Sequence, residues 1–253
     1  MRMKAIFKRE FKSFFHNMTG PIFMAAIFVF MGIYFVAYNV IQGYPYLTAA
    51  LSGMSFILLL TVPILTMRSF AEERKTKTDQ LLLTSPVSVT QIVLGKYLAM
   101  VTVLLVPILL ICFCPLIIAM NGSATLTADY AAILAFFCMG CVYIAVGMFV
   151  SALTESQIIA AVGTFAALLV LCLWTDLVSF LPDSLAQLLS SFDFQGVLDN
   201  FAYYSVFDLG GLLLYLSMAA VFVFLTVQVL QRRKGITSAA TTCFWKGSKN
   251  QFP

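Results

Sequence analysis

Six long stretches of apolar, almost uncharged residues dominate this chain of 253 residues. A helix needs about 20 consecutive apolar residues to cross the hydrocarbon core of a bilayer, and each stretch has that length. Lipid offers the backbone no hydrogen-bond partners, so such stretches must be helical, and they lack the alternation of membrane barrel strands. The sequence therefore predicts an all-α polytopic membrane protein with six transmembrane spans. The predicted spans are residues 21–41, 47–67, 97–120, 131–153, 157–180 and 209–230.

The composition argues against a soluble domain. Only 10% of the residues are charged and 61% are hydrophobic, whereas about a quarter of a typical soluble domain is charged. The chain has too little polar surface to cover a globule. The first apolar stretch follows a basic segment and lacks a small-residue cleavage site. We therefore expect it to be retained as a transmembrane helix.

The basic residues mark one side of the membrane. All 15 Lys and Arg residues lie before the first span, between spans two and three, or after the last span. In a six-span topology these three segments share one side, and the positive-inside rule assigns that side to the cytoplasm. We therefore expect both termini to be cytoplasmic. The chain then divides into an N-terminal segment 1–20, a membrane domain 21–230 and a basic tail 231–253.

The N-terminal segment has the pattern of an interfacial elbow helix. Its aromatic residues recur at helical spacing, and its basic residues lie largely elsewhere on the helix. A basic amphipathic helix of this kind lies in the membrane interface. Two interpretations stay open, an elbow that transmits a push to span one and an anchor that fixes orientation. The aromatic candidates are Phe7, Phe11, Phe14 and Phe15.

The connection at 181–208 is the largest segment on the opposite side. It is acidic and aromatic and contains no Lys or Arg. It is interpreted either as an interfacial aromatic belt, or as an outer gate or docking surface for an extracytoplasmic partner. The candidate residues of this outer segment are Asp193, Asp199, Phe201, Tyr203 and Tyr204.

The central segment 68–96 is densely charged between two apolar spans. Its pattern predicts a helix over 71–84 that carries a leucine patch and ends before Pro86, because the residue before proline avoids helical geometry. Ser88 or Thr90 can cap a new helix that continues into span three. Mixed charge around an apolar patch suits a protein-docking surface. The alternative is a charged loop with snorkelling anchors.

Several chemical functions have little support in the sequence. The phosphate-loop pattern is absent, because Gly95-Lys96 is followed by Tyr97 and position 90 is Thr. The spans contain almost no ionisable residues, which argues against an ion-driven carrier. The spacing of Cys138 and Cys141 favours packing in a bundle over metal binding. We expect no catalytic, metal or cofactor site in this chain.

The segment AEERKTKTDQLLLTSPVSVTQIVLGKYLA resembles the signature of the type-2 exporter permeases of ABC transporters. The overall plan of an interfacial helix, six spans and a long outer segment is also similar, most of all to the short gliding-motility and nitrous-oxide-reductase-maturation permeases. Lys77 and Gln80 stand where the family usually has Gly and Glu, and Asp79 replaces an apolar residue, which changes the charge pattern offered to a partner. The matching residues are Glu72-Glu73, Thr78, Leu81-Leu82-Leu83, Ser85-Pro86-Val87, Ile92-Val93 and Gly95-Lys96.

The resemblance implies a non-catalytic permease subunit of an ATP-driven exporter in the bacterial cytoplasmic membrane. Two permease copies or paralogues would form a dimer, and each would receive a separate P-loop ATPase that binds ATP and magnesium. No nucleic-acid partner is implied. Two alternatives stay open: an ATPase-bound subunit that transmits force to an extracytoplasmic partner without moving solute, and a scaffold without an ATPase. The implied ATPase-coupling residues are Glu72, Glu73, Arg74, Thr78, Leu81, Leu82, Leu83 and Pro86.

Overall fold

The computed structural model describes residues 2–75, 88–121, 126–179, 194, 196–197, 200 and 209–249. Every regular element in these ranges is a helix, which confirms the predicted all-α class for the described part of the chain. In chain order the elements are α1 (Arg2–His16), α2 (Thr19–Tyr34), the π-helix η1 (Phe35–Ile41), α3 (Thr48–Thr66), α4 (Ala71–Lys75), α6 (Val89–Ile111), α7 (Cys114–Asn121), α8 (Leu126–Leu153), α9 (Gln157–Cys172), α10 (Trp174–Ser179) and α13 (Leu209–Lys249).

Five helical stretches in the described ranges are long and apolar enough to cross a membrane. They correspond to the predicted spans one to four and six, so the chain is a multi-pass membrane protein. Each extends beyond the corresponding predicted span at one end. The five stretches are Thr19–Ile41, Thr48–Lys75, Val89–Met120, Leu126–Leu153 and Leu209–Lys234.

The predicted fifth span, residues 157–180, is not one continuous helix. The structure divides it into α9, with 16 residues, and the short α10. Helix α9 ends because Leu173 has φ −87° and ψ 10°, outside the α-helical region. At 1.5 Å per residue α9 is about 24 Å long, shorter than the roughly 30 Å hydrocarbon core. The described part of the chain therefore has five helices long enough to span and one shorter apolar helix, and the predicted sixth span is not confirmed.

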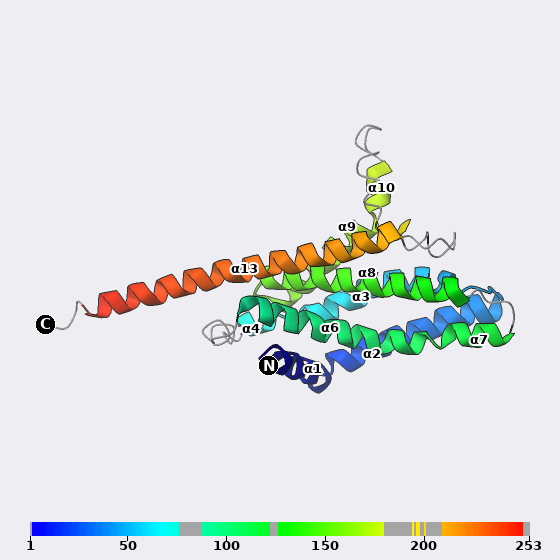
Figure 1. Ribbon diagram of the computed structural model, residues 1–253, viewed down its shortest axis with the longest axis horizontal. Helices are drawn as coiled ribbons and strands as arrows, with labels where there is room; N and C mark the ends of the chain where they lie inside the picture. Colours follow the sequence, from blue (N-terminus) through cyan, green and yellow to red (C-terminus); the bar gives the residue numbers. More distant parts are fainter. Residues whose placement is uncertain are drawn as a thin grey trace.

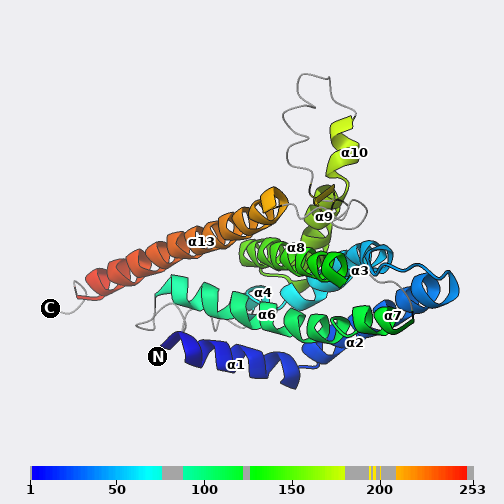
Figure 2. The ribbon, with the colours of Figure 1, turned by 45° about the vertical axis from the view of Figure 1, so that its right-hand side comes forward.

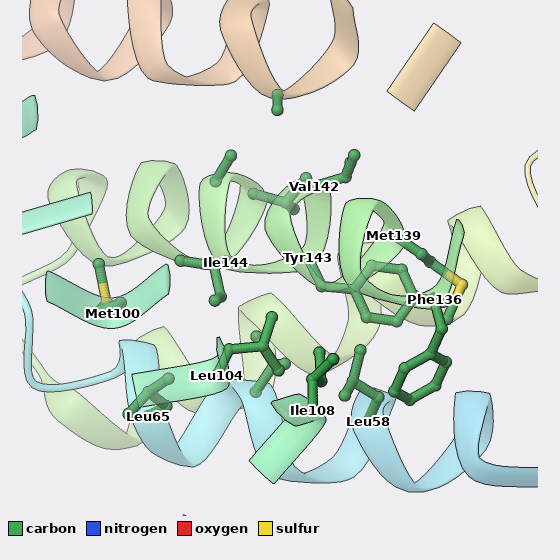
Figure 3. Packing of buried hydrophobic residues seen from close by; sticks show 14 of the residues in the cluster. Leu58, Leu65, Met100, Leu104, Ile108, Phe136, Met139, Val142, Tyr143 and Ile144 are labelled. Atoms are coloured by element: carbon green, nitrogen blue, oxygen red, sulfur yellow. The ribbon is translucent and has the colours of Figure 1, made fainter. Parts of the chain in front are cut away.

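Helix α8 is the centre of the bundle. It packs against α3, α6, α9 and α13, and Figure 1 shows α3, α6, α8 and α13 running lengthwise beside one another. Between α8, α3 and α6 lies a core of fully buried side chains, which Figure 3 shows from close by. It includes Leu58, Leu104, Phe136, Met139 and Tyr143. This core fixes the positions of α6 and α8, which carry Lys96 and Ser151 of the site described below.

The charged elements gather at one end of the bundle. Helix α4, the start of α6 and the end of α8 lie there beside α1, and α7 lies at the opposite end (Figure 1). We call the end that carries α1 and α4 the basic end. Helix α13 continues well beyond it, whereas α9 and α10 rise away from the lengthwise helices (Figure 2).

The far end of α3 is held by α8. The backbone N–H of Leu47 donates a hydrogen bond of 2.9 Å to Oδ1 of Asp129, and the Asp129 side chain is fully buried. A carboxylate at a helix N-terminus satisfies a backbone donor that has no partner within the helix. The cap comes from a neighbouring helix, so it also sets how α3 and α8 align along their lengths.

Candidate coupling site

A buried lysine at the basic end joins three elements. Lys96, near the start of α6, is only 2% exposed. Its ammonium group donates hydrogen bonds to Glu73 Oε1 at 2.8 Å and to the carbonyl of Ser69 at 2.9 Å. It also donates to Glu10 Oε2 at 3.3 Å. Glu10 belongs to α1 and Glu73 to α4, so one ammonium group connects α1, α4 and α6.

Burial of this charge requires the surrounding acceptors. An ammonium group has three donors, and the three acceptors around Lys96 match that number. The Phe70 ring lies 5.1 Å from the nitrogen and adds a cation–π contact. Arg9 completes the cluster, with its Nη2 2.9 Å from Glu10 Oε1 and 3.8 Å from Glu73 Oε1. Two cations therefore face two carboxylates, and we call this cluster of Arg9, Glu10, Glu73 and Lys96 the ion network.

The ion network changes the acidity of Glu10. Burial raises the pKa of its carboxyl, but Lys96 and Arg9 outweigh that effect, so the pKa lies below its ordinary value. A carboxyl with a lowered folded-state pKa stabilises the fold above its unfolded-state pKa, and this contribution is lost as the pH falls through the folded-state pKa.

We therefore expect thermal stability to be insensitive to Glu10 ionisation near neutral pH and to fall under acid conditions. Thermal unfolding at a series of pH values below about 4.5 tests this. The Glu10→Gln variant should be less stable at neutral pH and should show a shallower acid-side decline. A decline as steep as that of the unchanged chain would contradict the assignment.

A second set of contacts fastens α4 to α8. The hydroxyl oxygen of Ser151 accepts hydrogen bonds from the backbone N–H groups of Phe70 and Ala71, both at 3.2 Å. The same hydroxyl donates to the carbonyl of Met67 at 3.3 Å. Ser151 is fully buried and acts as a helix cap supplied from another helix. An ion pair between Arg74 and Glu155, just beyond α8, holds the other end of α4.

Close packing brings α1 against α6 beside the ion network. A Cβ atom at Gly95 would lie 3.0 Å from Cγ2 of Ile6, closer than side chains normally approach. Glycine therefore lets α1 contact the turn of α6 that carries Lys96. Gly95 therefore allows α1 and α6 to approach closely, and Lys96 holds them together through its bond to Glu10.

The structure places part of the predicted coupling set in this site. Glu73 lies in the ion network, and Arg74 pairs with Glu155. Oε2 of Glu72 lies 3.9 Å from Nε of Arg68. The sequence patterns did not identify Glu10 or Ser151. Glu10 is the only acidic residue before Glu72, and that isolation in a basic helix was the available signal. The predicted residues Thr78, Leu81, Leu82, Leu83 and Pro86 lie outside the described residues.

The elbow phenylalanines differ in their surroundings. Phe14 is buried, Phe7 and Phe11 are half-buried, and Phe15 is 39% exposed. The rings of Phe7 and Phe11 stack with centroids 6.0 Å apart. Most of this aromatic set thus packs against the bundle, and Phe15 faces outward.

The outer segment reaches the bundle through Phe194. Its ring stacks on Tyr143 of α8 with centroids 5.6 Å apart and meets the edge of Tyr215 of α13 at 4.8 Å. The Tyr215 hydroxyl donates to the carbonyl of Phe194 at 2.7 Å. The sequence patterns did not single out Phe194. The predicted outer residues Asp193, Asp199, Phe201, Tyr203 and Tyr204 lie outside the described residues.

The family model described as ABC-2 family transporter protein matches residues 36–227, which is most of the chain. No individual curated protein matches. The matched region contains Glu73, Lys96 and Ser151, whereas Glu10 precedes it. The predicted likeness to the gliding-motility and nitrous-oxide-reductase-maturation subgroup gains no support from this match. The chain belongs to the ABC-2 family of transporter membrane proteins.

Proposed function

We propose that this permease couples ATP hydrolysis by a separate ATPase subunit to the export of a substrate across the bacterial cytoplasmic membrane. The observation that carries the proposal is the double attachment of α4. The ion network ties α4 to α1 and α6, and Ser151 ties it to α8. A force applied next to α4 would therefore move three helices together.

The segment that follows α4 is the proposed contact for the ATPase. It carries Leu81, Leu82 and Leu83 between charged residues, and an apolar patch within a charged rim suits protein docking. The basic end would face the cytoplasm, where the ATPase binds ATP and magnesium. Closure of the ATPases would push this segment, and α4 would pass the displacement to α1, α6 and α8. A second permease copy or paralogue would complete the transporter.

Replacing Leu82 and Leu83 together by Asp should reduce co-purification of the ATPase by about tenfold or more. Central apolar residues of interfaces contribute about 2 kcal/mol or more each, and buried carboxylates would oppose docking. The measurement is a gentle-detergent pull-down of the tagged chain from its native host, followed by mass spectrometry and an ATPase assay.

The matched control is Ser88→Asp, which adds a carboxylate to the same connection at the N-cap of α6, where Asp is favoured. It should retain the ATPase. Size-exclusion chromatography must show that both variants elute like the unchanged chain. An intact, active complex of the Leu82→Asp, Leu83→Asp variant would overturn the assigned contact, and a chain without any ATPase partner would overturn the coupling function.

A second candidate function is transmission of force to an extracytoplasmic partner without solute movement. The anchorage of Phe194 between Tyr143 and Tyr215 favours it, because movement of α8 and α13 would be passed to the outer segment. Both candidates share the ATPase contact, so the pull-down does not separate them. ATP-dependent flux into sealed inverted vesicles does, since hydrolysis without flux across a panel of amphiphilic substrates favours force transmission.

A further inference from the structure

Helix α1 carries an exposed row of basic side chains. Lys8, Lys12 and His16 are spaced four residues apart, which places them on one face of the helix. All three are exposed. We call Lys8, Lys12 and His16 the basic face of α1. Phe15 lies on the same side and is 39% exposed, and Met18, just after the helix, is 69% exposed.

Within the described part of the chain, the basic face has no acidic partner. Glu10 is the only acidic residue before Glu72 in the sequence, and it lies on the opposite side of α1, where it binds Lys96 and Arg9. Among the described residues, no ion pair involves Lys8 or Lys12. The positive charge of this face is therefore available to an anion from outside the bundle.

The position of the face favours a membrane lipid as that anion. Met18 takes up a left-handed backbone conformation with φ 59°, and the chain turns there from α1 into the first spanning helix. Figure 2 shows α1 on the outside of the bundle beside α6. Basic side chains next to exposed Phe and Met residues at the start of a span match the interfacial boundary, where cationic side chains meet headgroups and apolar ones meet acyl chains.

We propose that the basic face of α1 binds the headgroups of anionic phospholipids, and that the bound lipid acts on the ion network through Arg9. The second half of this proposal rests on the coupling function proposed above. Arg9 links the two because its side chain is 58% exposed while its Nη2 contacts Glu10 at 2.9 Å. It follows Lys8 directly, so a phosphate on Lys8 lies within reach of its free guanidinium donors.

Binding of a headgroup would change how Arg9 is shared. A guanidinium group binds phosphate with two parallel hydrogen bonds, which competes with its longer contact of 3.8 Å to Glu73. Glu73 would then keep Lys96 but lose Arg9, and the attachment between α1 and α4 would weaken. Anionic lipid would in this way set how firmly α4 is held to α1.

Lipid retention by the full-length chain without its ATPase tests the binding site. The chain is purified in gentle detergent with equal amounts of phosphatidylglycerol and phosphatidylcholine, and the retained ratio is measured by mass spectrometry. The Lys8→Gln, Lys12→Gln variant should retain about tenfold less phosphatidylglycerol. The control Arg232→Gln, Lys234→Gln removes two charges from α13 and should retain as much as the unchanged chain. Equal retention by all three chains overturns the site.

ATPase activity of the complex in vesicles tests the link through Arg9. We expect phosphatidylglycerol at about 30 mol% to change the activity of the unchanged complex about fivefold. Arg9→Gln should abolish this response while phosphatidylglycerol retention persists. Activity independent of phosphatidylglycerol in the unchanged complex overturns the link. If no ATPase binds at all, the coupling function fails, and the lipid measurement on the chain alone still decides the site.

Discussion

Replacement of Lys96 by Met should lower the free energy of unfolding by about 3 kcal/mol, the largest stability effect that the structure predicts for one side chain outside the core. Methionine keeps most of the length of the side chain but removes the charge. Glu10 and Glu73 would then lose the cation that both of them bind, while Arg9 stays beside them. Their side chains are 14% and 20% exposed, so water can screen the repulsion only in part.

Thermal unfolding in detergent, followed by circular dichroism, measures this effect. The matched control is Lys75→Met, at an exposed lysine in the same part of the chain, which should change stability by no more than about 0.5 kcal/mol. Adding Glu73→Gln to Lys96→Met should recover part of the loss, because it removes one of the two carboxylates that Lys96 binds. A double variant no more stable than Lys96→Met would show that the two side chains do not interact as the structure indicates.

The Lys96→Met variant also tests the proposed coupling function. Without Lys96, α4 loses its hydrogen bond to α6, while the longer Arg9–Glu73 contact to α1 and the bonds to Ser151 remain. The proposed coupling function therefore predicts that the ATPase still binds while ATP-dependent flux is lost. Complete loss of ATPase binding would instead place Lys96 in the docking surface itself.

The membrane-crossing part of the fold was largely predictable from the sequence. Apolar runs near 20 residues bounded by charges leave few alternatives in a bilayer, and five predicted spans correspond to long helices. The break at Leu173 was not predictable, because no proline or glycine lies between Leu168 and Asp176 to distinguish a divided helix from a continuous one.

The candidate site was predictable only in fragments. The charged segment and the Gly95-Lys96 pair stood out by pattern and resemblance, but their connection depends on contacts between residues far apart in the chain. Lys96 meets Glu73 across 23 positions and Glu10 across 86. A local sequence pattern cannot predict these ion pairs, because they form only when α1 packs on α6. Ser151 was noticeable only as a small residue, although its hydroxyl caps α4.

Substitution of Gly147 by Ala should lower stability by about 2 kcal/mol, because α3 and α8 touch at this residue. A Cβ atom at Gly147 would overlap Oγ1 of Thr66 and lie 2.9 Å from its Cβ. Thr66 is fully buried, and its hydroxyl donates to the carbonyl of Val62, so it cannot rotate away freely. The two helices must therefore separate locally, which loses packing between small residues.

Gly32→Ala is the matched control, since a Cβ atom at Gly32 meets nothing within 4 Å. The same chemical change there should leave stability unchanged or raise it by about 0.5–1 kcal/mol through better helix propensity. Thermal unfolding of both variants gives the comparison. Equal behaviour of the two would mean that α3 and α8 are not in close contact at Gly147.

The Gly147 variant should also impair coupling, because Ser151 lies one helical turn further along α8. Its hydroxyl reaches the backbone of Phe70 and Ala71 at 3.2 Å, so even a small separation of α3 from α8 would break both bonds. Adding Thr66→Ala removes the nearest clashing atom and should restore part of both stability and ATP-dependent flux. Recovery of stability without recovery of flux would show that the spacing of α3 and α8 matters for the fold alone, and that α4 receives its functional support from the ion network.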